Sequence, residues 1–180
     1  AARTERSSSR NASSTMSSER SSRTNPRIAA RRISLSPSRA SVRTRCIQTA
    51  TAIALPHERQ LHLSEEIVEI AFTDPDASMG MIEEDEVRAV MGLWMAGDID
   101  AAPPGGESLK QLFQRFLPWT RQTIERHAAT PGTLVIVSHG GALAAGLTQL
   151  FPNVSPFFAL ANMFDNTDTA TGRFIDGHLH

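Results

Sequence analysis

Apolar residues recur at strand and helix spacings along the part of the chain that follows residue 40. Four consecutive apolar residues at 134–137 predict a short, fully buried strand. His139, Gly140 and Gly141 come directly after it, and the Ala- and Leu-rich run that follows predicts a helix. In an open α/β sheet, ligands bind where a strand ends and the next helix begins. The free N–H groups of a helix N-terminus suit an anion such as phosphate at that point.

Two earlier segments have the spacing of amphipathic helices. Residues 46–55 predict a helix that ends at Pro56, which cannot continue it. Residues 83–95 predict a second helix, because apolar residues recur there at helical spacing. The faces of these two helices comprise Ile47, Ala50 and Ala54 in the first and Val87, Val90, Met91 and Trp94 in the second.

The clearest helix begins at Ser108, which forms a capping box with Gln111. Pro131 and Gly132 end it, and Pro118 is expected to kink it or split it in two. Its apolar face comprises Leu109, Leu112, Phe113, Phe116 and Ile124.

The remaining segments are predicted as connections. Residues 65–72 read as a strand or an extended loop, and residues 153–166 as a loop with a short helical piece. Residues 74–81 and 98–106 are predicted as loops, and residues 167–180 show no periodicity. Helices and strands that alternate along a chain are typical of a parallel α/β sheet.

Charge divides the chain into two chemically different parts. Residues 1–45 hold eleven Arg and two acids, a net charge of +9, whereas the remainder carries −10 and the whole chain −1. Cys46 is the only cysteine, so no intrachain disulfide or cysteine metal cluster can form. No apolar run approaches the roughly 18 residues of a membrane span, so a soluble, cytoplasmic protein is expected.

Residues 1–40 are rich in Ser and Arg and contain no aromatic residue. Such a segment buries too little apolar surface to offset its ordering entropy, so we expect disorder and early cleavage by proteases. Three explanations are open: an organelle transit peptide, a basic arm, or a stretch read in the wrong frame, which we favour. Nucleic acid is not the expected partner, because no aromatic side chain accompanies the Arg residues to stack on bases.

Several motifs in a fixed order resemble the histidine phosphatase superfamily, the phosphoglycerate mutase-like group. The resemblance covers residues 41–166 and rests on segments 41–50, 93–98, 103–108, 115–118 and 137–142. The first of these, Ser41-Val42-Arg43-Thr44-Arg45-Cys46-Ile47-Gln48-Thr49-Ala50, is similar to the family's S-x-l-x-R-a-x-q-T-A signature. It implies a three-layer α/β domain with a mostly parallel sheet, here expected to lack its first strand. We therefore expect a disordered segment at 1–40 and an incomplete domain at 41–180.

The same resemblance implies a phosphomonoesterase or phosphomutase that works through a phosphohistidine, with a phosphorylated small molecule as substrate and no cofactor or metal. His139 matches the family's second His and Arg45 a phosphate-binding Arg, with Gly140 at the anion site. The proton-donating Glu matches Glu69, with Glu66 as its rival. Phosphoryl transfer needs mainly positioning and charge neutralisation, which suits these side chains.

The chain departs from the family at its nucleophile. The R-H-G motif that carries the attacking His is absent before His139. We therefore expect little or no turnover, and the alternative is a non-catalytic phosphate-binding remnant or pseudoenzyme. An esterase is a weaker alternative, because no G-x-S-x-G nucleophile motif accompanies His139. If the family match is right, Arg45 and His139 must lie close enough to share one anion. Neither the oligomeric state nor the particular substrate follows from the sequence.

Overall fold

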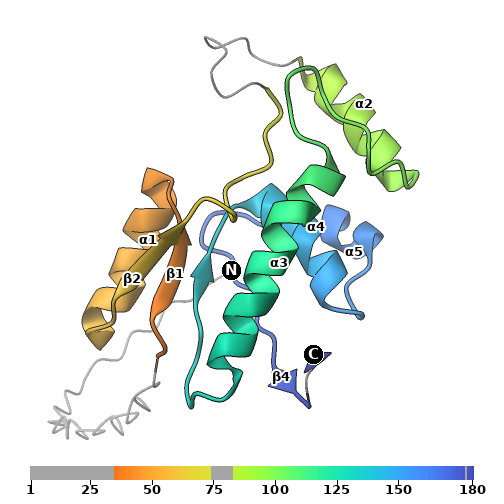
Figure 1. Cartoon of the computed structure of the whole chain (residues 1–180). Helices are drawn as coiled ribbons and strands as arrows, with labels where there is room; N and C mark the ends of the chain where they lie inside the picture. The colour runs from red at the N-terminus through yellow and green to blue at the C-terminus, as the bar shows by residue number, and fades with distance from the viewer. Residues whose placement is uncertain (1–34, 74–82, 177) are drawn as a thin grey trace, which may run out of the picture. The chain divides into compact units, whose positions relative to one another are not determined.

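The computed structural model describes residues 35–73, 83–176 and 178–180. Its central element is a three-stranded parallel sheet in the order β2-β1-β3, as the α/β prediction requires. The strands are β1 (Ser38–Ser41), β2 (Leu61–Ser64) and β3 (Ile136–Val137). Helix α1 (Thr44–Ala54) packs on one side of the sheet, and α3 (Leu109–Ala128) and α4 (Gly140–Leu150) lie on the other (Figure 1).

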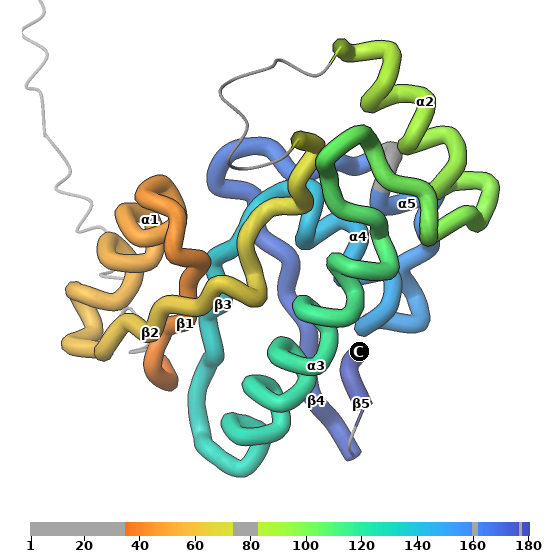
Figure 2. Tube along the Cα trace, turned by 45° about the horizontal axis from the view of Figure 1, so that its top comes forward, coloured from red at the N-terminus to blue at the C-terminus, as the bar shows by residue number. Residues whose placement is uncertain are grey.

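The remaining elements are short or peripheral. A single 3-10 turn, η1 (Leu55–His57), contains Pro56 and ends α1 where expected. Helix α2 (Glu84–Met95) matches its prediction, and α5 (Pro156–Ala161) is the expected short helical piece. An antiparallel hairpin of β4 (Phe174–Ile175) and β5 (His178–Leu179) lies beside the C-terminal end of α3 (Figure 2).

Two apolar clusters hold the two sides of the sheet. Ala40 packs with Cys46 and Ala50 of α1, and Leu61 and Val137 contact this cluster. The larger cluster lies between α3, α4 and the segment before α2. Its buried members are Ile67, Ile70, Leu112, Phe116 and Ala142, and Ile136 packs against them. Successive β3 residues thus face opposite clusters, as the alternation of a strand requires.

The folded part begins earlier than the expected boundary at residue 41. Leu35 is buried and forms a parallel bridge with Thr133, and Ser38 and Ala40 are fully buried in the sheet. The prediction of disorder up to residue 40 is therefore wrong for residues 35–40. Small Ser and Ala side chains fit beneath α1 and need little apolar surface of their own. The expectation for residues 1–34 lies outside the described residues.

Three other local predictions are corrected. The sequence did not indicate β2. Residues 65–72, for which a strand or an extended loop was expected, form a loop. The strand predicted at 134–137 shrinks to Ile136–Val137 and is only partly buried, because β3 is an edge of the sheet within the described residues. The hairpin at 174–179 was also missed, since strands of two residues leave no periodic pattern. The loop predicted at 74–81 falls outside the described residues.

Helix α3 confirms its predicted start but not its predicted break. Ser108 and Gln111 form the reciprocal capping box, and the helix runs through Pro118 as one element of 20 residues. Phe116 and Thr120 are buried on either side of Pro118, so packing holds the helix where the proline removes one backbone hydrogen bond. Within the described residues, no helix combines the length and the apolar character that crossing a membrane requires.

Candidate phosphate site

The carboxyl ends of β1 and β3 bring together residues that are far apart in the sequence. His139 follows β3 as the N-cap of α4, and Arg45 lies in the first turn of α1. Arg45 Nη2 is 2.7 Å and Nε 3.2 Å from His139 Nδ1. The expectation that these two residues lie at one place is confirmed, although 94 positions separate them.

The protonation of His139 follows from its partners. A guanidinium can only donate, so Nδ1 of His139 accepts from Arg45 and the ring proton of the neutral form lies on Nε2. Nε2 is 2.9 Å from Ser41 Oγ, to which it then donates. The residue is only 4% exposed. Burial, and secondly the charge of Arg45, lower the pKa of His139 below its ordinary value.

Cys46 packs against the buried ring of His139. Its thiol donates to the Ser138 carbonyl at 3.3 Å, and its sulfur lies 3.5 Å from His139 Nε2. Burial raises the pKa of the Cys46 thiol, which keeps it protonated and suits it to packing rather than to nucleophilic attack.

Glu69 occupies the N-terminus of α4. Its carboxylate accepts hydrogen bonds from the backbone N–H of Ala142 at 2.7 Å, Gly141 at 3.2 Å and Ile70 at 3.0 Å. A Cβ atom at position 141 would lie 2.8 Å from Glu69 Oε1, so only glycine leaves room for the carboxylate. The sequence indicated an external anion at the N-terminus of α4. In the structure, the Glu69 carboxylate already accepts from the Gly141 and Ala142 amides there.

The loop that carries Glu69 is fixed from α3. Arg115 donates to both oxygens of Glu107, each at 2.7 Å. It also donates to the carbonyl oxygens of Glu66, Val68 and Glu69 at 2.8, 3.0 and 3.1 Å. Arg115 lies within a motif that carried the resemblance, but its structural role was not foreseen. Ser108 caps α3, as the sequence suggested, and Glu107 is the carboxylate partner of Arg115.

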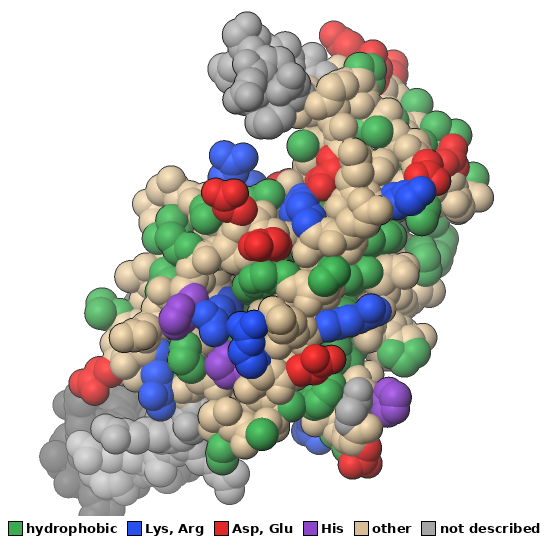
Figure 3. Space-filling model, in the orientation of Figure 1, with side chains coloured by type: hydrophobic (Ala, Val, Ile, Leu, Met, Phe, Trp, Pro, Cys, Tyr) green, Lys and Arg blue, Asp and Glu red, His purple; other side chains and the backbone are tan. Residues whose placement is uncertain are grey.

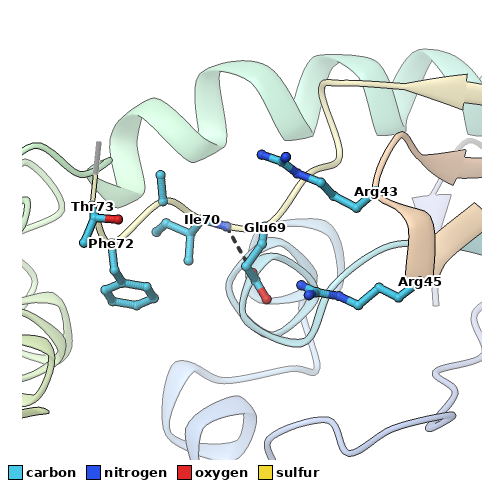
Figure 4. A pocket seen from close by; sticks show the side chains of 7 residues that line it. Arg43, Arg45, Glu69, Ile70, Phe72 and Thr73 are labelled. Atoms are coloured by element: carbon cyan, nitrogen blue, oxygen red, sulfur yellow. Dashed lines mark hydrogen bonds between the residues drawn. The ribbon is translucent and has the colours of Figure 1, made fainter. Parts of the chain in front are cut away.

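A cavity of about 360 Å³ opens beside these groups (Figure 4). Arg43 and Arg45 extend into it from one side, and Glu69 lies between them and the apolar end formed by Phe72 (Figure 4). Its full lining is Arg43, Arg45, Glu69, Ile70, Ala71, Phe72 and Thr73. Arg43 was missed as a site residue, and its only signal was its place two residues before Arg45.

Some predicted site residues lie apart from the cavity. Glu66, the rival of Glu69, accepts a hydrogen bond from Ser64, which lowers the pKa of Glu66, and it does not line the cavity. Gly140 does not line it either, and His139 lies behind Arg45. Among the described residues, no group of three or more His, Cys, Asp or Glu side chains is arranged to hold a metal ion.

Comparison with protein families gives a match over residues 18–178 to the histidine phosphatase superfamily (branch 1). The 2,3-bisphosphoglycerate-dependent phosphoglycerate mutases of Brucella canis and Brucella melitensis biotype 1 are each 34% identical over 74 residues. Those residues represent 38% of this chain and 35% of either mutase. The match thus spans about a third of the length of these curated relatives.

Solved structures show the same fold at low sequence identity. A phosphoserine phosphatase mutant from Entamoeba histolytica has a TM-score of 0.60 at 21% identity, covering 81% of this chain and 71% of its own. A mycobacterial glucosyl-3-phosphoglycerate phosphatase with inorganic phosphate has a TM-score of 0.59 at 19% identity, covering 80% and 73%. The three-layer phosphoglycerate mutase-like architecture of the described residues agrees with both.

Proposed function

We propose, from the premise that the chain belongs to the histidine phosphatase superfamily (branch 1), that it acts on phosphomonoesters as a phosphatase or a phosphomutase. The supporting observation is the contact of 2.7 Å between Arg45 Nη2 and His139 Nδ1 beside a cavity. These groups lie at the carboxyl ends of parallel strands, where open α/β sheets bind their ligands.

Two guanidinium groups suit the phosphoryl group of the substrate. Arg43 and Arg45 line one wall of the cavity, and a phosphomonoester carries close to two negative charges at neutral pH. The guanidinium of Arg43 makes no hydrogen bond within the described part of the chain, and Arg45 keeps Nη1 free of any there. Arginine grips phosphate through a planar fork of donors, so both side chains could hold the same group.

The apolar end of the cavity defines the kind of ester. Ile70 and Phe72 offer apolar surface, and Thr73 adds a hydroxyl. A cavity of about 360 Å³ lies at the small end of the range for organic ligands, so a small phosphorylated metabolite fits better than a macromolecule.

Glu69 is the proposed acid for the leaving group. It lies in the cavity wall near both arginines, where the ester oxygen of a bound substrate would be within reach. To donate, one of its oxygens must take up a proton and release its amide partner on α4 or in the loop. We assign the acid to Glu69 rather than Glu66 because Glu69 lines the cavity and Glu66 does not.

The second candidate is the non-catalytic phosphate-binding remnant. His139 has one ring nitrogen engaged by Arg45 and the other by Ser41, and its ring is buried. A histidine that attacks phosphorus needs a free lone pair, so His139 would have to break its contact with Arg45 first. A phosphohistidine on His139 is therefore disfavoured, and this second candidate would bind phosphate with negligible turnover.

We also propose a cytoplasmic location. The single cysteine is buried and unpaired, which fits a reducing compartment.

The experiment compares the parent chain with Arg45→Gln, His139→Ala and the control Arg88→Gln. Arg88 lies on α2, where its partners among the described residues are Glu84 and Asp85. Vanadate and phosphate binding is measured by calorimetry, and turnover with a generic phosphomonoester. We expect the parent and Arg88→Gln to bind, and Arg45→Gln to bind at least tenfold more weakly, because it loses charge-assisted hydrogen bonds.

The outcomes separate the two candidates. Turnover together with an acid-labile phosphohistidine would establish the enzyme, and binding without turnover would establish the remnant. Equal phosphate binding by the parent and Arg45→Gln would contradict both.

A further inference from the structure

The sheet carries charged side chains on the face opposite α1. Ala40, Leu61 and Val137 pack with the α1 cluster, and strand alternation turns their neighbours the other way. Arg39 of β1 and His62 of β2 are paired in register, so they stand side by side on that opposite face. Parallel sheets usually bury both faces under apolar cover, which makes this pair unusual.

The last turn of α3 adds Arg126 and His127 to the same place. Arg39 Nη2 donates to His127 Nε2 at 3.4 Å, so that ring nitrogen is an unprotonated acceptor. Figure 3 shows Lys, Arg and His side chains gathered over the sheet and the C-terminal end of α3. We call Arg39, His62, Arg126 and His127 the sheet-face cluster.

The sheet-face cluster has no counter-charge within the described part of the chain. Burial, then Arg39, Arg126 and His62 lower the pKa of His127, and no carboxylate acts on it. Burial and Arg126 lower the pKa of Arg39 in the same way. The described ion pairs use Arg88, Lys110 and Arg115 instead.

Neither the dipole of α3 nor a nearby acid accounts for all the positive charges of the sheet-face cluster. The negative end of the α3 dipole stabilises cations in its last turn, which accounts for Arg126 and His127 but not for Arg39 and His62 on the strands. Glu125, the nearest acid along α3, lines a different cavity with Leu150 and Phe174.

We infer that the sheet-face cluster is a second anion site, which binds a small molecule carrying two or more phosphate-type charges. None of its four residues lines the cavity of Arg45, so this inference does not depend on the proposed function. The two guanidinium groups supply fixed positive charge, and the ring nitrogen of His127 that accepts from Arg39 becomes a second donor when it takes up a proton. Binding should therefore be coupled to proton uptake and strengthen as the pH falls towards 6.

The test uses inorganic pyrophosphate and the NMR signals of the histidine rings, in the Arg45→Gln background so that binding in the cavity is weakened. We expect saturable shifts of the His62 and His127 signals and a rise in the pKa of His127. Adding Arg39→Gln or the exposed Arg126→Gln should weaken binding about tenfold, since each removes charge-assisted hydrogen bonds. Adding Arg88→Gln should leave binding unchanged.

Three results would overturn the inference. They are unresponsive His62 and His127 signals, shifts that sodium chloride of equal ionic strength reproduces, or pyrophosphate affinity that survives both Arg39→Gln and Arg126→Gln.

Discussion

The N-termini of α1 and α4 meet at the carboxyl end of the sheet, and they are closed in different ways. The carboxylate of Glu69 accepts two of the free N–H groups in the first turn of α4, those of Gly141 and Ala142. Helix α1 has no side-chain cap, and its first turn holds no acid. It carries Arg43 and Arg45 instead, at the end where the helix dipole is already positive.

This difference indicates where an external anion is needed. Each cation at a helix N-terminus costs about 0.3–1 kcal/mol, and a bound anion would offset that cost at α1. At α4 the chain supplies its own anion, because Glu69 already accepts from the amides of Gly141 and Ala142. The comparison therefore favours a phosphate held by the α1 arginines, with the α4 end serving to position Glu69.

Gly141→Ala is the change with the largest expected effect on this comparison. The new Cβ would lie 2.8 Å from Glu69 Oε1, so the carboxylate must shift and its hydrogen bonds to the α4 amides are strained or lost. We expect the free energy of unfolding to fall by about 2 kcal/mol, as measured by urea denaturation. The control is Gly92→Ala in α2, where nothing lies within 4 Å and a gain of about 0.5–1 kcal/mol is expected. Equal effects at the two glycines would show that Glu69 is not needed at α4.

Glu69→Ala is expected to be milder, because it removes the cap of α4 without adding a clash. The loss should be about 1 kcal/mol in the free energy of unfolding. Phosphate affinity should increase slightly, since the cavity loses a negative charge beside Arg43 and Arg45. The measurement is denaturation together with phosphate calorimetry, and weaker phosphate binding would place Glu69 among the ligands of the anion.

The pH dependence of stability should show the smallest effect. His139 has a folded-state pKa below its ordinary value of 6.5, so below that pH the unfolded chain binds more protons than the folded one. Stability should therefore fall as the pH drops from about 6.5 and level off below the folded-state pKa. His127 shifts in the same direction, so the urea series compares His127→Gln with His127→Gln/His139→Gln. The slope below pH 6.5 should shrink in the double variant, and an unchanged slope would exclude His139 as its source.

The sequence predicted those features that depend on residues a few positions apart, such as helix caps, helix ends and helical spacing. The capping box of Ser108 and Gln111, the stop at Pro56 and helix α2 all appear where expected. The meeting of Arg45 and His139 was predictable through the family resemblance, although the strand before Arg45 was not itself predicted.

Features that depend on distant packing were not predictable. Pro118 stays inside α3 because buried neighbours on both sides hold the helix. Helix propensities of single residues do not contain this packing. The contact of Glu69 with Gly141 and Ala142 joins residues more than 70 positions apart. No role of its own followed for Arg43 from the sequence, and only the folded structure shows that it lines the same cavity as Arg45.

The anchoring of the Glu69 loop by Arg115 has a consequence for local unfolding. One guanidinium holds three carbonyl oxygens of this loop and the carboxylate of Glu107, so the loop cannot open without releasing its bond to α3. Hydrogen exchange in the loop should then follow the slow opening of the helix rather than the fast fluctuation of an ordinary surface connection. The loop that carries Glu69 is thus expected to unfold together with α3 and not independently of it.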